Sequence, residues 1–470
     1  MSMTTNRRSF LFGASVAGFG VLVEGKRSLA WGVGPNDVLN IACIGVGGKG
    51  DSDTQHAARV GRVVAVCDID QERLDKMAAK QKESKKFNDY RELLHELGDK
   101  VDAVIVSTPD HTHAPAACMA MRMGKHVYCQ KPLAHTVWEA RLMRETAREK
   151  KVCTQMGNQG TADSGFRGAV ELVRSGAIGE VTEVHVWTNR PFNYWKQAPD
   201  IVARSPESVP IPSHVHWDLF LGTAPERPYN PIYHPHNWRG WWDFGTGALG
   251  DMACHTTNLP FMALQLGLPV RVSAKSGEIN SETYPAWATI TYEFPARGNL
   301  PPVKLTWYEG AKDGKRHLPP SNIFPDRGLP PSDSGSVMIG SRYRMYSPND
   351  YGARQVVWPK EGYTELKVPE ATLPRHERGR DIDANQKREW VEAIRAGKPS
   401  LALSNFDYAA TLTESMLLGN IATRSGKPVV GSKKPEWAGS FDYSPETGEI
   451  AGNTEAGRYL KPYIRKGWEI

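Results

Sequence analysis

Two widely separated segments of the 470-residue chain carry side chains that can exchange a proton with a substrate. Lys131 follows a short apolar run, and Asp251 and His255 lie four residues apart after a glycine-rich turn. If a helix begins near Ala248, Asp251 and His255 share one face and can act together on one ligand. Because lysine and histidine can both be tuned to transfer protons near neutral pH, the three residues predict acid–base chemistry. The alternative is a structural pair, in which the histidine satisfies a buried aspartate.

A glycine-rich run near the start of the chain predicts a dinucleotide-binding turn. An apolar segment from Val38 to Ile44 leads directly into Gly45-Val-Gly-Gly-Lys-Gly50, a G-x-G-x-x-G pattern. A polar segment through Arg59 can form a helix, and a second apolar strand, from Arg62 to Cys67, ends at Asp68. Strand, turn, helix and acid thus follow the order of a nucleotide-binding βαβ unit. A glycine-rich turn in another doubly wound sheet, with an incidental acid, is the alternative.

Each residue of this pattern has an expected role. Gly45 permits the tight turn, Gly47 lets the backbone approach a pyrophosphate, and Gly50 lets the helix pack closely on the strand. The helix N-terminus then faces the phosphates. Asp68 is expected to accept hydrogen bonds from the adenosine ribose hydroxyls, and its charge would repel a 2′-phosphate. The expected cofactor is therefore NAD, with NADP less favoured.

The alternation of helices and strands continues, which predicts an open parallel sheet. Helices are expected at 71–82 and 90–97, and strands at 103–106 and 126–129. Ligands of such sheets gather beyond the carboxyl ends of the strands. The residues that follow these two strands, and are expected to meet the nicotinamide, are Thr108, Pro109, His113, Gln130 and Lys131.

A second set of strand candidates predicts one mainly antiparallel sheet. These candidates lie at 181–188, 270–275, 286–294 and 303–307. Between the first two lies a tryptophan-rich segment containing Trp187, Trp195, Trp217, Trp238, Trp241 and Trp242. Flat aromatic faces suit the C–H faces of sugar rings, so one or two of these side chains, with Trp238 chosen, are expected to line a carbohydrate cleft. The others are expected to pack inside a long insertion.

Two His-x-His steps could contribute to a metal site. His214 with His216, and His234 with His236, could join Asp243 or Asp251 as imidazole and carboxylate ligands. The spacing matches no specific metal-binding pattern. Histidines in a tryptophan-rich loop more often bond to sugar hydroxyls or to the backbone, so no metal is expected.

Taken together, these motifs resemble the Gfo/Idh/MocA family of nicotinamide-dependent sugar and polyol oxidoreductases. The resemblance covers about residues 38–430 and rests on the glycine-rich turn, Asp68, Thr108-Pro109 with His113, Lys131-Pro132, Ile178-Gly179-Glu-Val181, and the Asp251/His255 pair. It implies an α/β chain, with an N-terminal doubly wound Rossmann domain followed by an α+β domain with a large, mainly antiparallel open sheet. It also implies a homo-oligomer, a dimer or a tetramer. The family commonly has glutamate where this chain has Gln130, which leaves the partner of Lys131 open.

The resemblance implies hydride transfer between nicotinamide and a secondary hydroxyl of a sugar, polyol or glycoside. Lys131 would polarise the oxygen, His255 would transfer the proton, and Asp251 would bind neighbouring hydroxyls and orient the site. Some relatives hold NAD tightly and recycle it to cleave glycosidic bonds, and the same residues would serve that reaction. A third hypothesis is a non-catalytic sugar-binding protein on a Rossmann scaffold.

The first thirty residues are expected to form a twin-arginine signal peptide. Arg7 and Arg8 precede an apolar stretch from Phe10 to Val23 and the small-x-small site Ser28-Leu-Ala30. That stretch is shorter than the roughly 20 residues that cross a bilayer, and no later segment qualifies as a membrane span. We therefore expect export to the periplasm or another extracytoplasmic compartment. A retained N-terminus or an uncleaved anchor is the alternative.

Composition narrows the remaining classes of function. Lys and Arg number 58 against 52 Asp and Glu, a net charge of +6 without dense basic runs, so nucleic acid is not an expected partner. The six cysteines form no C-x-x-C pair and are expected to be buried thiols. The stretch 295–380, rich in proline and glycine, predicts long loops between strands, and 385–396 and 409–423 predict helices. The expected division is a signal peptide at 1–30, a Rossmann domain at 36–155, a substrate-binding and oligomerisation domain at 156–430, and a tail at 431–470.

Overall fold

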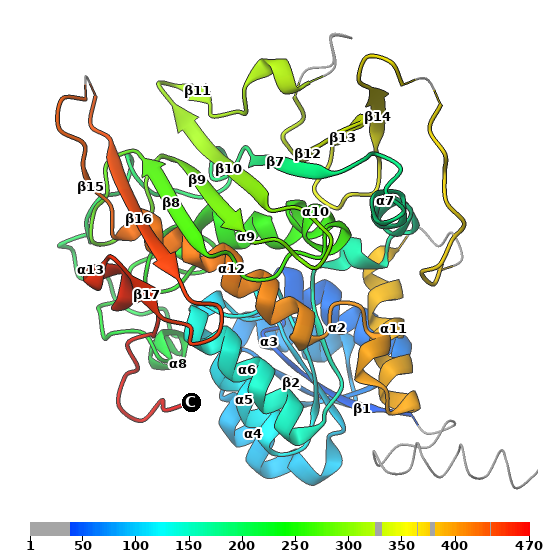
Figure 1. Cartoon of the computed structure of the whole chain (residues 1–470). Coiled ribbons are helices and arrows are strands. Elements are labelled where there is room, and N and C mark those ends of the chain that lie inside the picture. Colours follow the sequence, from blue (N-terminus) through cyan, green and yellow to red (C-terminus); the bar gives the residue numbers. More distant parts are fainter. Residues whose placement is uncertain (1–37, 325–330, 364, 377–380, 433) are drawn as a thin grey trace, which may run out of the picture.

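Two β-sheets organise the chain, one in each half of the molecule (Figure 1). The structure, a computed structural model, describes residues 38–324, 331–363, 365–376, 381–432 and 434–470. The expected signal peptide at 1–30 lies outside the described residues.

The first sheet has six parallel strands in the order β3-β2-β1-β4-β5-β6, so the predicted doubly wound fold is confirmed. Its strands are β1 (Asn40–Ile44), β2 (Arg62–Cys67), β3 (Lys85–Phe87), β4 (Ala103–Val106), β5 (His126–Cys129) and β6 (Thr154–Met156). Its helices are α2 (Lys49–Val60), α3 (Gln71–Lys80), α4 (Tyr90–Leu97), α5 (His113–Arg122) and α6 (Val137–Lys150). All residues of β4 and β5 are buried, as expected of parallel strands covered on both faces.

The second sheet is mixed and mainly antiparallel, as predicted. Its main path runs β14-β13-β12-β7-β10-β9-β8-β16-β15, and β7 with β10 is its parallel pair among the described strands. Its strands are β7 (Val181–Thr188), β8 (Arg271–Ser276), β9 (Trp287–Phe294), β10 (Val303–Lys312), β11 (Lys315–Arg316), β12 (Ser334–Gly340), β13 (Tyr343–Ser347), β14 (Val356–Pro359), β15 (Lys427–Pro428), β16 (Trp437–Tyr443) and β17 (Ile450–Ala451).

Some of the remaining helices pack on this sheet, and others belong to or pack on the first domain. The α-helices are α7 (Ser164–Arg174), α8 (Trp217–Leu221), α9 (Gly247–Thr256), α10 (Asn258–Ala263), α11 (Ile382–Ala396), α12 (Phe406–Arg424) and α13 (Thr454–Gly457). The short 3-10 turns are η1 (Gly98–Lys100), η2 (Asp110–Thr112), η3 (Gln159–Ala162), η4 (Asn237–Gly240), η5 (Ser321–Ile323) and η6 (Pro399–Leu401). Helix α12 packs on the second sheet and also against α6, so it lies between the two halves (Figure 1).

The expectation of long loops at 295–380 is wrong in part, because β11 to β14 lie there. β12 pairs antiparallel with β7 and is almost wholly buried. Its sequence, Ser-Gly-Ser-Val-Met-Ile-Gly, carries small residues that dilute the strand signal, and its burial depends on a partner about 150 residues earlier in the chain. The tail also contributes to the sheet, since β16 pairs with β8.

Helix α11 packs against the first sheet although it follows strands β7 to β14 of the second sheet in sequence. Trp390, Val391 and Ile394 share a buried cluster with Leu39 and Ile41. The half of the molecule that holds the first sheet is therefore completed by a helix from the second predicted domain.

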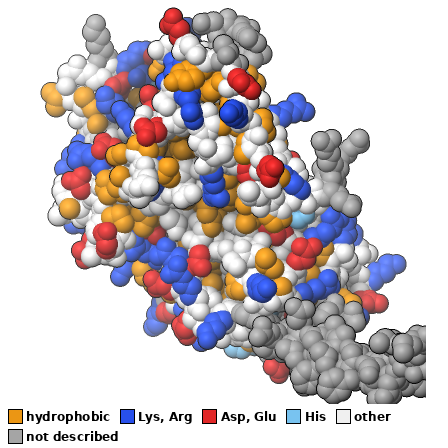
Figure 2. Space-filling view, turned by 45° about the vertical axis from the view of Figure 1, so that its right-hand side comes forward, with side chains coloured by type: hydrophobic (Ala, Val, Ile, Leu, Met, Phe, Trp, Pro, Cys, Tyr) orange, Lys and Arg blue, Asp and Glu red, His pale blue; other side chains and the backbone are white. Residues whose placement is uncertain are grey.

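All six cysteines are unpaired and buried, as predicted. Within the described ranges, no helix has the length and apolar character needed to cross a membrane. On the face shown in Figure 2, Lys and Arg side chains are interspersed with Asp and Glu side chains.

Candidate active site

A cavity of about 420 Å³ lies beyond the carboxyl ends of the first sheet's strands. Its lining includes the glycine-rich turn after β1, Asp68 after β2, the Ser107–Asp110 run after β4, and Lys131 after β5. The second domain closes it with residues of the tryptophan-rich segment and with Asp251 and His255 of α9. The cavity therefore brings together residues from both halves of the chain.

The glycine-rich turn has the geometry of a close backbone approach. Gly45 adopts a φ of +78°, and a Cβ there would lie 2.7 Å from the carbonyl oxygen of Ser107. A Cβ at Gly50 would lie 1.8 Å from the carbonyl oxygen of Gly45, so α2 packs directly on the turn. Gly47 and Gly48 line the cavity, and a Cβ at Gly48 would meet no atom within 4 Å. The open turn leads into the N-terminus of α2, where the backbone favours an anion.

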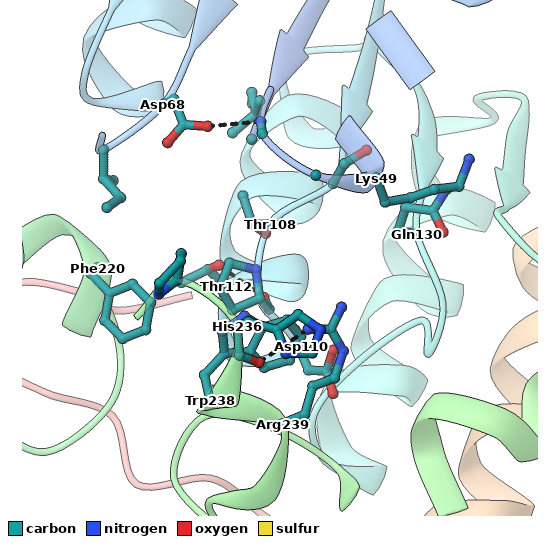
Figure 3. Close-up of a pocket in the computed structure, with 18 of the residues that line it drawn as sticks. Lys49, Asp68, Thr108, Asp110, Thr112, Gln130, Phe220, His236, Trp238 and Arg239 are labelled. Carbon is teal, nitrogen blue, oxygen red and sulfur yellow. Dashed lines mark hydrogen bonds between the residues drawn. The ribbon is translucent and has the colours of Figure 1, made fainter. Parts of the chain in front are cut away.

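Asp68 lines the cavity and also holds the turn in place (Figure 3). Its Oδ2 accepts hydrogen bonds from the backbone N–H groups of Val46 and Gly47, at 2.9 and 3.1 Å, and its Oδ1 accepts from Asp70 N at 3.0 Å. Burial raises the pKa of this carboxyl. A carboxylate has about four acceptor sites, two on each oxygen, so Oδ1, which accepts one hydrogen bond, keeps a site for a ribose hydroxyl. Arg73 also lines this end of the cavity.

Thr108 and Pro109 line the cavity, whereas His113 does not. The His113 ring lies 2.8 Å, through Nδ1 and Nε2, from the carbonyl oxygens of Pro132 and Thr108. Burial lowers the pKa of His113 to about 4. The His113 ring therefore lies between the two loops that carry Thr108 and Lys131, and in its neutral form it donates a hydrogen bond to one of the two carbonyl oxygens.

Lys131 is held by Asp251, a residue of the other domain. Lys131 Nζ donates to Asp251 Oδ1 and to the Asp251 carbonyl oxygen, both at 2.7 Å. Arg239 Nε lies 3.5 Å from the same Oδ1. Lys131 and Arg239 hold the pKa of Asp251 well below its usual range despite burial. Asp251 is thus a fixed negative charge rather than a proton carrier.

His255 is buried in the same cavity, and its Nδ1 has no hydrogen-bond partner. Burial, and then the nearby Lys131, hold the pKa of His255 well below 6.5, so the ring is neutral near pH 7. Tyr351 packs edge-on against it with ring centroids 5.0 Å apart. A neutral imidazole with an unpartnered nitrogen can accept a proton from a ligand.

Gln130 contacts a buried charge network rather than Lys131's side chain. Its Nε2 donates to Asp53 Oδ2 at 2.7 Å, and Ser107 Oγ donates to the same oxygen at 2.9 Å. Asp53 Oδ1 accepts from Lys49 Nζ at 2.8 Å and from Lys387 Nζ at 2.7 Å. The network joins α2 to the loop before Lys131 and to α11, and Figure 3 shows Lys49 beside Gln130.

Of the six tryptophans in the tryptophan-rich segment, Trp238 lines the cavity. The Arg239 guanidinium carbon lies 4.2 Å from the Trp238 ring centroid, and Figure 3 shows both below Asp110. Trp217 and Trp241 belong to a buried cluster within the tryptophan-rich segment, as expected. Trp187 instead lies on β7 and belongs to a buried cluster of the second sheet.

Sequence reasoning missed several residues that line this cavity: Asp110, Gln159, Arg190, Arg239, Tyr351 and Trp468. Asp110 stands in the same run as Thr108 and Pro109, so its place after β4 was a usable signal. Its carboxylate accepts from Thr246 N and Oγ1, at 3.0 and 2.6 Å, and burial raises its pKa to about 7. Gln159 shortly follows β6 of the same sheet, so its position was also a usable signal. Arg239, Tyr351 and Trp468 reach the cavity through long-range packing that no local sequence pattern predicts.

Among the described residues, no group with metal-ligand spacing combines the histidines of the two His-x-His steps with Asp243 or Asp251. Asp243 pairs with Arg227, and Asp251 pairs with Lys131. His214 and His234 instead lie 4.0 and 3.8 Å from Asp70. Ligand atoms of Asp70, Glu72 and His214 lie within 4.8 Å of one another, but Asp70 is already the N-cap of α3.

Two family descriptions match consecutive parts of the chain and together span more than half of it. "Oxidoreductase family, NAD-binding Rossmann fold" matches residues 39–158, and "Oxidoreductase family, C-terminal alpha/beta domain" matches residues 166–299. The chain belongs to the Gfo/Idh/MocA oxidoreductase family. The glycine-rich turn, Asp68 and Lys131 fall in the first match, and Asp251 and His255 fall in the second.

Curated proteins match about a third of the chain. The inositol 2-dehydrogenase of Salmonella typhimurium is 33% identical over 155 residues, which cover 31% of this chain and 45% of that protein. The alpha-N-acetylgalactosaminidase of Shewanella oneidensis is 36% identical over 157 residues, covering 31% of this chain and 34% of that protein. The chain thus spans less than half the length of these relatives.

Solved structures align with most of the chain. An inositol dehydrogenase homolog from Azotobacter vinelandii, complexed with NADH and myo-inositol, aligns with a TM-score of 0.54 at 19% identity, covering 81% of this chain and 94% of that chain. An NAD binding oxidoreductase from Klebsiella pneumoniae aligns with a TM-score of 0.57 at 18% identity, covering 83% and 97%. At these identities the likeness shows the fold.

Proposed function

We propose that this Gfo/Idh/MocA protein is an NAD-dependent oxidoreductase that transfers a hydride between nicotinamide and a secondary hydroxyl of a sugar, polyol or glycoside. One observation carries the proposal. Lys131 of the nucleotide-binding domain and Asp251 of the second domain meet at 2.7 Å in the cavity entered by the glycine-rich turn, and His255 lines the same cavity.

The residues present fit a dinucleotide. The turn is open at Gly48, where an added Cβ would meet nothing within 4 Å. Thr108 Oγ1 and Gln159 Oε1 are buried, line the cavity and have no hydrogen-bond partner, so they can bond to a ligand. The acid Asp68 at the adenosine end favours NAD over NADP, because a 2′-phosphate would be repelled.

Lys131, His255 and Asp251 have different roles in the proposed reaction. A bound nicotinamide would supply the hydride acceptor. Lys131 Nζ has three hydrogens and can donate one to the substrate oxygen while Asp251 holds the ammonium group in place. His255 can accept the hydroxyl proton as the C–O bond becomes a carbonyl. Asp251, kept ionised by its cations, can also accept hydrogen bonds from neighbouring hydroxyls.

Replacing Lys131 by methionine tests this assignment. We expect Lys131→Met to bind NADH as the wild type does and to lose nearly all turnover with sugars or polyols. Lys82→Met, a change at an exposed lysine of the same domain, is the matched control and should keep full turnover. Turnover that survives in Lys131→Met would contradict the proposal.

A second candidate is a glycoside hydrolase that retains and recycles NAD. The observation that favours it is the 36% identity to the alpha-N-acetylgalactosaminidase over 157 residues. The mass spectrum of protein as purified should then show NAD(H) that survives dialysis. Cleavage of aryl glycosides without net NADH formation supports the hydrolase, and net NADH formation with free sugars supports the dehydrogenase.

We also propose export through the twin-arginine route and assembly into a dimer or tetramer. The supporting features are the paired arginines Arg7 and Arg8 before an apolar stretch, and the family resemblance. N-terminal sequencing of exported protein should begin after residue 30, and light scattering should give the assembly's mass. An intact Met1 on soluble cytoplasmic protein, or a monomer mass, would contradict these proposals.

A further inference from the structure

We propose that the segment 458–470 forms the outer wall of the adenosine end of the cavity, with Trp468 as the residue that contacts the adenine ring. The inference rests on the proposed function, which places the reacting carbon near Lys131 and the adenosine ribose near Asp68. Trp468 lines the cavity, as do Ile69 and Tyr90 near the ends of β2 and β3. It therefore lies at the end of the cavity assigned to adenosine.

The Trp468 ring is fixed in a defined orientation. It is 7% exposed, and the Arg91 guanidinium carbon lies 3.9 Å from its ring centroid. Tyr90 packs beside it with ring centroids 6.5 Å apart. Trp468 N donates to the Arg465 carbonyl oxygen at 3.0 Å, which makes a tight turn before the ring. A buried, fixed aromatic side chain at a cavity wall is suited to stacking on a flat ligand.

A second buried side chain anchors the same segment. Arg465 is 7% exposed, and its guanidinium donates to the carbonyl oxygens of Gly222 and Asp218 at 3.0 and 2.9 Å. Arg465 N donates to the Thr223 carbonyl oxygen at 3.0 Å. These acceptors lie on or just after α8, near which the chain ends in Figure 1. Leu219 and Phe220 of α8 also line the cavity.

The segment therefore connects the two sides of the adenosine end. It contacts α4 of the nucleotide-binding domain through Trp468 and α8 of the tryptophan-rich segment through Arg465. We assign the adenine base to this segment, because stacking requires only a π-face. The two cations of this wall are already engaged, since Arg91 contacts Trp468 and Arg465 bonds to the backbone of α8. A wall made by a distant segment lengthens the residence time of the dinucleotide, since release must break this contact.

The test compares Trp468→Leu with Tyr463→Leu in the full-length chain. Tyr463 belongs to the same segment but is 64% exposed, so it is the matched control. We expect Trp468→Leu to weaken AMP binding, and to speed NADH release, by about tenfold, as for loss of one base-stacking contact. Binding of nicotinamide mononucleotide should not change, and Tyr463→Leu should match the wild type in all three measurements.

The outcomes separate the two proposals. If the wild type binds NADH but Trp468→Leu retains wild-type affinity for AMP, the inference is overturned and the proposed function stands. If the wild type binds no NADH, the proposed function fails and the inference with it. Should Trp468→Leu not fold, hydrogen–deuterium exchange on the wild type decides, since amides of 458–470 should exchange more slowly with AMP present. Unchanged exchange would overturn the inference.

Discussion

Replacing Asp53 by asparagine should destabilise the protein far more than the same change at Asp51, two residues earlier on α2. The Asp53 side chain is fully buried and accepts from four donors, including Lys49 and Lys387. Lys387 is also fully buried, so in Asp53→Asn its ammonium group keeps a carboxylate only at 3.8 Å, in Asp383. An amide oxygen cannot replace a carboxylate that accepts four hydrogen bonds.

The structure sets the size of this effect. Removing one partner of a buried ion pair costs about 3–5 kcal/mol, because the other charge stays buried. The lysines hold the pKa of Asp53 at about 2, below its ordinary 3.8, and this shift alone corresponds to roughly 2 kcal/mol. Asp51 pairs with Lys80 at the surface, where an ion pair contributes about 1 kcal/mol or less.

Urea unfolding at neutral pH, followed by tryptophan fluorescence and circular dichroism, measures the difference. Asp53→Asn should lower the free energy of unfolding by about 3–5 kcal/mol, and Asp51→Asn by about 1 kcal/mol or less. Adding Lys387→Met to Asp53→Asn should recover part of the loss, because the unpaired buried charge is gone. An Asp53→Asn variant as stable as Asp51→Asn would refute the reasoning.

The pH dependence of the free energy of unfolding tests the same contacts of Asp53. Because the folded pKa of Asp53 lies below the unfolded value, its contribution is full above pH 3.8 and is lost as pH falls toward 2. The wild type should therefore lose stability across that window more steeply than Asp53→Asn. Parallel curves would show that Asp53 does not titrate as its surroundings require.

Three further substitutions test the glycine-rich turn, the proposed proton acceptor His255 and the residue before Lys131. Gly50→Ala should weaken NADH binding by about tenfold or more, measured by fluorescence titration, because its Cβ would lie 1.8 Å from the Gly45 carbonyl oxygen. As the pH falls, kcat/KM should decrease only well below pH 6.5, because burial and Lys131 keep His255 neutral at pH 6.5. His255→Gln should remove this acidic decrease. Gln130→Glu should lower the midpoint of urea unfolding, because a carboxylate would then face Asp53 Oδ2, to which Gln130 Nε2 donates at 2.7 Å. An unchanged midpoint would contradict this contact.

The first domain was predictable because its signals are local. Apolar runs bounded by turns give β4 and β5 the bounds expected from sequence, and the G-x-G-x-x-G run places the turn between β1 and α2. The Asp251/His255 spacing also predicts the helix that carries both residues. Each of these features depends on neighbours within a few residues.

The rest depends on partners far along the chain. Asp53 has the pattern of an ordinary polar helix residue, and its burial follows from Lys387, 334 residues later. Trp468 and Arg239 reach the cavity only once the second domain is packed on the first. β12 is a strand because β7 pairs with it, not because its serines and glycines favour one.

The glutamine before Lys131 is the departure from the family resemblance, and the buried network gives it a physical reason. A glutamate at 130 would place a second carboxylate near Asp53 in a site where repulsion is weakly screened. A neutral donor such as the Gln130 amide is therefore favoured opposite Asp53. The carboxylate of this region belongs to Asp53 on α2, and the residue after β5 is uncharged. Lys131 takes its carboxylate partner from α9, so the lysine is oriented only when the second domain is in place. The position of Lys131 and the closure of the cavity by the second domain therefore depend on the same contact.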